Sequence, residues 1–240
     1  QIATEHRLYL PSIGFCLVFG TFWLNASRFL SIRKILFLST LLLMSVLSIN
    51  RILDFKSEIM IWKDVVKKSP RKVLARNNLA IAFLNKDMDE LAEKHLKIAL
   101  KLNPAFRSAN LNLGHIFFKR EDYLQAKKYF DLAIFYGENN SLIFYNAGLT
   151  QIRLNNPLEG IKYFKKAITQ KPENSGYHYA LGNAYKTLKR KDEAIKEYKK
   201  TLNLDPSNSS SQNNMGVIFF ENKMYRLAEE AFLKTLRINK

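Results

Sequence analysis

Histidine, cysteine and acidic side chains are the groups that most often catalyse reactions or hold metals in proteins. The four histidines are His6, His95, His115 and His178, and none lies at metal-ligand spacing from another histidine, a cysteine or an acid. Cys16 is the single cysteine, which excludes a disulfide framework. No glycine-rich phosphate loop, nucleophile elbow or isolated carboxylate pair is present. The sequence therefore predicts no catalytic site, no metal site and no cofactor within these residues.

Asparagine is the polar side chain with a regular spacing. Asn78, Asn112 and Asn146 are separated by equal intervals, Ala180 occupies the next point, and Asn214 follows it. An amide side chain offers a donor and an acceptor together, so it can pair with one peptide unit of an extended chain. The alternative is that these amides bond a neighbouring helix. The spacing thus predicts either a ladder that binds peptide backbone or a set of contacts between helices.

The elements that position these asparagines repeat with the same period, in repeats that begin at residues 73, 107, 141, 175 and 209. Small residues occupy positions 8 and 20 and let two helices cross closely. A bulky residue at position 24 is expected to fill the space between one helix pair and the next, and a proline ends most second helices. The residues at position 8 are Ala80, Gly114, Gly148, Gly182 and Gly216, and those at position 24 are Leu96, Phe130, Phe164, Tyr198 and Phe232.

The residue types at these repeat positions resemble those of the tetratricopeptide repeat. The resemblance implies an all-α fold, an α-solenoid in which helix pairs form a right-handed superhelix. Trp62 and Val65 fall at positions 24 and 27 of the same register, so 55–72 is expected to form a capping helix, a degenerate half repeat. The five full repeats are expected at 73–106, 107–140, 141–174, 175–208 and 209–240.

The first helix of each repeat is expected to line a concave groove. Apolar and aromatic side chains near the asparagines would anchor the side chains of a bound segment. His115 is expected to face the groove as a contact residue, and Asn183 with Lys186 is a weak likeness to the carboxylate clamps of some repeat proteins. The predicted peptide-binding residues are Asn78, Asn112, Asn146, Asn214, Leu111, His115, Tyr145, Leu149, Tyr179 and Asn183, with Phe118 and Phe220 nearby.

The first 54 residues have a different composition. No charge occurs between Arg7 and Arg28, or between Lys34 and Arg51, and both stretches are mostly apolar. We therefore expect 1–54 to be a membrane region with two transmembrane helices, at about 8–27 and 34–53, in contact with membrane lipid. The basic connector around Arg33 would lie in the cytoplasm by the positive-inside rule. The repeats of this integral membrane protein would then be periplasmic, extracellular or lumenal.

The chain carries a formal net charge of +17, which raises nucleic acid and anionic lipid as partners. Lysine pairs recur on the second helix of several repeats, where they are expected to be solvated. No arginine-rich arm or RNA-binding aromatic motif accompanies them, so protein segments rather than nucleic acid are the predicted partners.

The N-terminal segment resembles a more particular family. EHRLYLPSIGF at 5–15 and W-x-x-V-V-x-x-x-P at 62–70 are similar to the junction between membrane and repeats in the transmembrane and tetratricopeptide repeat-containing O-mannosyltransferase family, in a bacterial-type relative. This resemblance implies a parent glycosyltransferase that uses a polyprenyl-phosphate sugar and whose catalytic acids lie outside this chain. Arg7 is then a candidate contact for a lipid phosphate, or else an interfacial anchor.

Three hypotheses follow from these patterns. The first is a membrane-anchored scaffold whose groove binds extended protein segments. The second is that the scaffold is the acceptor-recognition part of a protein O-glycosyltransferase. The asparagine run also resembles the ladder of O-linked N-acetylglucosamine transferase, although Ala180 interrupts it. The third is a structural assembly factor with no enzymatic parent.

Overall fold

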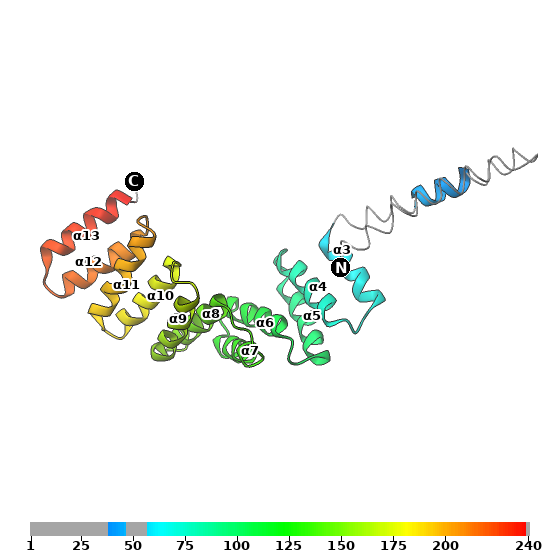
Figure 1. Ribbon diagram of the computed structural model, residues 1–240, viewed down its shortest axis with the longest axis horizontal. Coiled ribbons are helices and arrows are strands. Elements are labelled where there is room, and N and C mark those ends of the chain that lie inside the picture. Colours follow the sequence, from blue (N-terminus) through cyan, green and yellow to red (C-terminus); the bar gives the residue numbers. More distant parts are fainter. Residues whose placement is uncertain (1–37, 47–56, 239–240) are drawn as a thin grey trace, which may run out of the picture. The chain divides into compact units, whose positions relative to one another are not determined.

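The computed structural model describes residues 38–46 and 57–238. The chain divides into two compact units, Gln1–Ile61 and Trp62–Lys240. In the first unit, residues 38–46 form a helix, coloured blue in Figure 1. The helix α3 (Glu58–Lys68) begins in the first unit and ends in the second, and none of its residues is buried. Everything described after α3 is helix or turn.

The second unit is an array of helix pairs, and each helix packs mainly against its neighbours in sequence. Figure 1 shows α6 and α8 on one side of the array and α7 and α9 on the other. First helices of adjacent pairs also touch, as α8 and α10 do. The pairs are α4 (Val73–Leu84) with α5 (Asp89–Leu102), α6 (Arg107–Lys119) with α7 (Tyr123–Phe135), α8 (Ser141–Arg153) with α9 (Pro157–Gln170), α10 (Ser175–Thr187) with α11 (Lys191–Leu204), and α12 (Ser209–Glu221) with α13 (Tyr225–Ile238).

The turn inside each pair has the same backbone in every repeat. One residue of each turn adopts a left-handed conformation, with φ between 54° and 62°, at Asp87, Glu121, Asn155, Lys189 and Lys223. The amide of Asn155 donates to the carbonyl of Ile152, and the amide of the next residue donates to the carbonyl of Gln151. These bonds satisfy carbonyls at the end of the first helix and reverse the chain within a few residues.

Capping side chains start several of the helices. The side chains of Asp122, Asn140, Asn174 and Asn208 each accept a hydrogen bond from a backbone amide in the first turn that follows. Such a cap satisfies an amide that has no partner inside the helix. Three of the four caps begin the first helix of a repeat, so they fix where the next pair starts.

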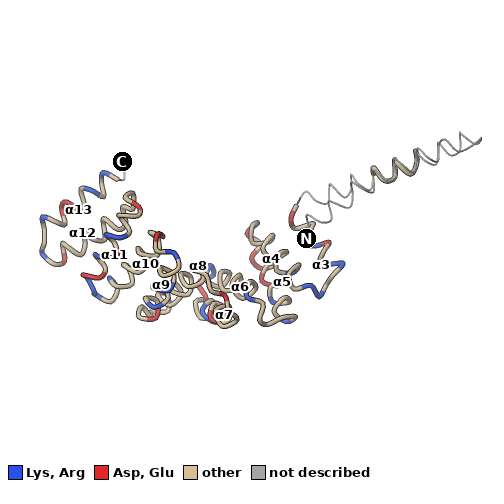
Figure 2. The backbone as a smooth tube through the Cα atoms, in the orientation of Figure 1, with Lys and Arg blue, Asp and Glu red and all other residues tan. Residues whose placement is uncertain are grey.

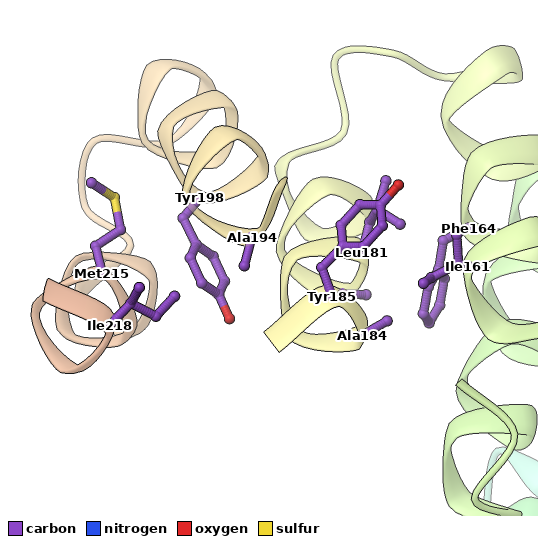
Figure 3. Packing of buried hydrophobic residues seen from close by; sticks show 10 residues of the cluster. Ile161, Phe164, Leu181, Ala184, Tyr185, Ala194, Tyr198, Met215 and Ile218 are labelled. Carbon is purple, nitrogen blue, oxygen red and sulfur yellow. The ribbon is translucent and has the colours of Figure 1, made fainter. Parts of the chain in front are cut away.

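The helices of a pair cross closely because glycine faces an aromatic ring. A Cβ atom added to Gly148 would lie 2.6 Å from Cε1 of Phe164, and the glycines at the same position of repeats two, four and five face their own aromatic rings in the same way. Phe164 also belongs to a core cluster that continues through α10 and α11 to Met215 and Ile218 of α12 (Figure 3). The residue at position 24 therefore packs both within its own pair and against the next.

The two membrane spans expected near 8–27 and 34–53 need correction. In the part of the chain that the structure describes, no helix is both long and apolar enough to cross a membrane. A spanning helix needs about 20 predominantly apolar residues. The predicted fold of two transmembrane helices before the solenoid, and the predicted integral-membrane location with extracytoplasmic repeats, are therefore not supported. The first span and Arg7 lie outside the described residues.

The predicted capping role of 55–72 stays a prediction. Trp62 and Val65 of α3 are half-buried. Lys63 of α3 places its ammonium group 5.7 Å from the centre of the Phe83 ring of α4, a cation–π contact inside the second unit.

Candidate functional site

The four predicted asparagines all lie on first helices of the array and are half-buried. Asn78 is on α4, Asn112 on α6, Asn146 on α8 and Asn214 on α12. We call the surface formed by these residues and their neighbours on α4, α6, α8, α10 and α12 the first-helix face. Ala180, which interrupts the series, is buried on α10.

At the start of the array, amides bond one another across the repeats. Nδ2 of Asn112 donates to Oδ1 of Asn77 over 3.2 Å, and Nδ2 of Asn77 lies 3.4 Å from Oδ1 of Asn78. Contact between neighbouring helices was one of the two alternatives that the spacing left open. The sequence prediction missed Asn77, because it follows no 34-residue series and becomes important only when α4 and α6 stack.

In the middle of the array, an imidazole takes the place of the second amide. Nδ2 of Asn146 lies 3.4 Å from Nε2 of His115 on the preceding first helix. Burial lowers the pKa of His115, so the ring is neutral near pH 7. An amide nitrogen can only donate, so Nε2 accepts and the proton of the neutral ring is on Nδ1. The ring also packs edge-on against Phe130, with centroids 5.4 Å apart. The ring of His115 is thus oriented by Asn146 and Phe130, and its role as a ligand contact stays a prediction.

Near the end of the array the amides form a larger network. Oδ1 of Asn183 accepts from Nδ2 of Asn214 over 3.1 Å and from the hydroxyl of Tyr198 over 2.7 Å. Nζ of Lys186 donates to Oδ1 of Asn214 over 2.9 Å. From the sequence alone, only a packing role is expected for Tyr198. A signal was present, since Tyr198 is the only tyrosine at a position where the other repeats have phenylalanine or leucine.

Aromatic side chains of the first helices pack against other aromatic rings. The ring of Tyr145 lies 5.0 Å from that of Tyr177 and 5.9 Å from that of Phe164, and the ring of Tyr179 lies 6.1 Å from that of Tyr198. Burial raises the pKa of Tyr145, so its hydroxyl is protonated and neutral at physiological pH. The predicted anchors Leu111, Phe118, Tyr145, Leu149 and Tyr179 are half-buried, whereas Phe220 is 58% exposed.

One histidine does meet an acid, although the sequence spacing gave no sign of it. Nδ1 of His178 lies 2.7 Å from Oε2 of Glu197, and Nε2 lies 3.0 Å from the carbonyl oxygen of Pro172. Both ring nitrogens therefore lie within hydrogen-bond distance of an oxygen atom. The His178 side chain is only 8% exposed, so this pair joins α10 to α11 inside the repeat and offers no open site.

Charges on the outside of the array are mixed. Figure 2 shows basic and acidic residues on several of its helices. The lysine pairs 127–128, 165–166 and 199–200 lie on second helices, and most of these side chains are exposed. Within the described residues, no group of three His, Cys, Asp or Glu side chains could hold a metal ion.

Comparison with family models shows what the repeated pairs are. Tetratricopeptide repeat models match residues 90–141, 142–174 and 175–208. The chain thus carries tetratricopeptide repeats, which confirms the resemblance seen in the sequence. These repeats form a scaffold for binding proteins, and this is the class to which the fold and the first-helix face assign the chain.

Two proteins with similar sequences are both protein O-mannosyl-transferases. Protein O-mannosyl-transferase Tmtc1 of Drosophila melanogaster is 29% identical over 119 residues, which are 47% of this chain and 14% of that protein. Protein O-mannosyl-transferase Tmtc2 of the same organism is 30% identical over 118 residues, 46% of this chain and 12% of that protein. The chain therefore spans only a small part of the length of these relatives.

Among solved structures, the repeat protein YrrB is similar in fold. Its TM-score is 0.69 at 21% identity, and the match covers 74% of this chain and 91% of that protein. YrrB is described as having an unusual peptide-binding site. At this level of identity the likeness shows the fold alone.

The lowered pKa of His115 predicts a dependence of stability on pH. The ordinary histidine pKa is about 6.5 in the unfolded chain, and burial lowers it in the folded chain. Between these two values the unfolded state binds more protons, so the free energy of unfolding falls as the pH drops below about 6.5. Burial also lowers the pKa of His95, which acts in the same direction.

Urea unfolding at pH 7.5 and 5.5 measures this effect. We expect His115→Gln to reduce the loss of stability between the two pH values, because glutamine cannot take up a proton there. His95→Gln is the matched variant, and its reduction should add to that of His115→Gln. An unchanged pH dependence in the His115→Gln protein would show that its imidazole is as easily protonated when folded as when unfolded.

Proposed function

We propose that the first-helix face binds an extended protein segment mainly through the segment's peptide backbone. The observation that carries this proposal is the way the asparagines are held. Asn112 and Asn146 each use Nδ2 in a contact with the preceding repeat, and within the described residues neither Oδ1 accepts a hydrogen bond. An acceptor fixed in this way is oriented for a backbone amide, and less side-chain freedom is lost on binding.

The two ends of the face offer different groups to the same ligand. At the start, Nδ2 of Asn78 remains for a carbonyl oxygen, since only its Oδ1 lies near Asn77. At the far end, Asn214 is bonded through both atoms of its amide, so it supports Asn183 more than it offers contacts of its own. We therefore place the backbone contacts at Asn78, Asn112 and Asn146, with Asn183 as the last donor.

Apolar anchors give the proposed site its preference for side chains. Tyr145 and Tyr179 occupy equivalent positions on α8 and α10, and Leu149 follows Tyr145 by one helical turn. Because all three are half-buried, they are oriented by packing and still present surface to a ligand. Rigid aromatic anchors of this kind contribute large contact area at low entropic cost.

A peptide selection tests the backbone contacts. Peptides of about a dozen residues are selected from a random library on the complete 240-residue chain, and titrated against variants. The double variant Asn112→Ala/Asn146→Ala should bind unrelated peptides at least about fivefold more weakly, since two hydrogen bonds of about 0.5–1.5 kcal/mol each are lost. The matched control Asn85→Ala/Asn203→Ala, at exposed turn and second-helix positions, should bind as the unaltered chain does.

The outcomes separate this proposal from its alternatives. Unchanged binding by a folded Asn112→Ala/Asn146→Ala protein would defeat the backbone ladder. A loss confined to some peptide sequences would show that side chains, and not the backbone, are recognised. A selection that yields no peptide would favour the third hypothesis, a purely structural assembly factor. Reversing the charge of Lys165 and Lys166 should have little effect at physiological salt, because exposed charges are screened.

A second candidate function is acceptor recognition for a protein O-mannosyltransferase. The observation that favours it is the similarity of the repeats to the two Drosophila enzymes. The repeats would present a protein segment to a catalytic part outside these residues, whose donor would be a polyprenyl-phosphate sugar. Incubation of the complete gene product with that donor and a selected serine- or threonine-containing peptide tests this. Mass spectrometry should detect one added hexose, and no transfer to any selected peptide would count against it.

A further inference from the structure

Four side chains at the far end of the first-helix face are joined by hydrogen bonds, and we call them the Asn183 network. Nζ of Lys186 donates to Oδ1 of Asn214 over 2.9 Å, and Nδ2 of Asn214 donates to Oδ1 of Asn183 over 3.1 Å. The hydroxyl of Tyr198 donates to the same oxygen of Asn183 over 2.7 Å. The network thus runs from α10 to α12 and joins the fourth repeat to the fifth.

Three of these four groups could bond in either direction. An asparagine amide carries both a donor and an acceptor, and a hydroxyl can donate or accept. Turning both amides over would therefore give a second network, in which each amide donates where it now accepts. The ammonium group of Lys186 differs, because it has three donors and no acceptor. Only Oδ1 of Asn214 can bond to it, and this choice sets the direction of the bonds that follow.

The direction of the network decides which atom of Asn183 is left for a ligand. Oδ1 of Asn183 accepts twice, and within the described residues no group accepts from its Nδ2. Asn112 and Asn146 are held in the opposite sense, since each uses Nδ2 in a contact with the preceding repeat. The fourth repeat therefore presents a donor, where the second and third repeats present an acceptor.

The sequence pairs Lys186 with Asn183 in one repeat only. Among the five repeats, the fourth alone has asparagine at position 9 and alone has a charged residue at position 12. Lys186 is half-buried, and in the part of the chain that the structure describes its bond goes to an amide, with no acid in an ion pair. The residues equivalent to Lys186 in the other repeats are Leu84, Phe118, Ile152 and Phe220.

We propose that Lys186 sets the hydrogen-bonding direction of the Asn183 network, so that Nδ2 of Asn183 donates to a carbonyl oxygen of the bound segment. Lys186 is a positioning residue in this role, because it acts through Asn214 and Asn183 and does not touch the segment. The role rests on the function proposed above, since Asn183 is one of the backbone contacts assigned there.

Substitutions of Lys186 that differ in hydrogen-bonding capacity test the proposal. The ligands are selected peptides that lack Asp and Glu and have both termini blocked, so they carry no negative charge. Lys186→Arg keeps a group that only donates and should bind as the unaltered chain does. Lys186→Met leaves both directions open and should weaken binding at least about twofold, since only a fraction of the molecules then hold Asn183 in the binding orientation. Lys186→Glu only accepts, so it favours the reversed direction and should weaken binding at least about tenfold.

An Asn183→Ala background separates positioning from direct contact. In that background Lys186→Met should have no further effect, because both changes remove the same contact with the segment. The matched control in the unaltered chain is Lys191→Met. It removes an ammonium group that bonds Oδ1 of Asn222 over 2.8 Å, outside the Asn183 network, and it should bind as the unaltered chain does.

The outcomes distinguish this role from the proposed function itself. Unchanged binding by folded Lys186→Met and Lys186→Glu proteins, while Asn112→Ala/Asn146→Ala still loses binding, would overturn the role and leave the other backbone contacts in place. A full loss from Lys186→Met in the Asn183→Ala background would also overturn it, by showing that the ammonium group contacts the segment directly. A selection that yields no peptide, or full binding by Asn112→Ala/Asn146→Ala, would remove the proposed function and this role with it.

Discussion

Gly148→Ala should destabilise the array strongly, although it adds a single methyl group. The new Cβ would lie 2.6 Å from Cε1 and 2.7 Å from Cδ1 of Phe164, well inside van der Waals contact. The ring is fully buried among residues of α9, α10 and α11, so it cannot swing into solvent. Overpacking of this kind costs about 1–3 kcal/mol. We expect a clear fall in the urea midpoint, followed by circular dichroism.

The first repeat indicates which second substitution should compensate for Gly148→Ala. Its equivalent pair is Ala80 with Leu96, whereas the other four repeats combine glycine with an aromatic ring. The double variant Gly148→Ala/Phe164→Leu should therefore be more stable than the sum of the two single changes predicts. Phe164→Leu alone removes buried volume and is itself destabilising. The difference from additivity in this cycle should be about 1–2 kcal/mol, in the range found for side chains in direct contact.

Gly176→Ala is the matched control for this cycle. Gly176 is also in a first helix, but the nearest atom to its added Cβ is Oδ1 of Asn174, at 3.2 Å, so only a small shift of this capping side chain is needed. Alanine has the higher helix propensity, so this change should have little effect or a slight gain. Strict additivity of Gly148→Ala and Phe164→Leu would show that the close crossing does not depend on this contact.

The repeat register could be predicted from the sequence because it depends on residue sizes at positions that meet within one helix pair. Position 8 must be small where position 24 is aromatic, and the pairs Gly148 with Phe164 and Ala80 with Leu96 both follow that rule. The amide contacts of Asn77 and Asn183 could not be predicted in the same way. These contacts join residues of different repeats, so they depend on the angle by which each helix pair is rotated relative to the preceding pair. The residue type at any one repeat position does not determine that angle.

The membrane prediction failed for a related reason. Apolar composition shows that a segment avoids water, but it does not specify the length of helix that forms. Within the residues that the structure describes, no helix is both long and apolar enough to cross a membrane, so apolar composition was not sufficient evidence for the two spans.

His178→Phe should also be strongly destabilising, because it leaves the carboxylate of Glu197 without its partner. The Glu197 side chain is only 18% exposed, and Oε2 lies 2.7 Å from Nδ1 of His178. Leaving a largely buried acceptor without its hydrogen-bond partner costs about 1–3 kcal/mol, and more where the acceptor is charged. The carbonyl of Pro172 loses its hydrogen bond as well. Urea unfolding at pH 7.5 measures the loss.

The third repeat shows how the pair can be replaced without this loss. Its equivalent residues are Phe144 and Tyr163, whose rings stack with centroids 6.5 Å apart. The double variant His178→Phe/Glu197→Tyr should therefore recover much of the stability that His178→Phe loses, since no carboxyl group is then left without its hydrogen-bond partner. If the double variant is no more stable than His178→Phe, the loss comes from packing or from Pro172, and the lost contact with Glu197 is not its cause. If His178→Phe loses less than about 1 kcal/mol, the pair contributes no more than an exposed one.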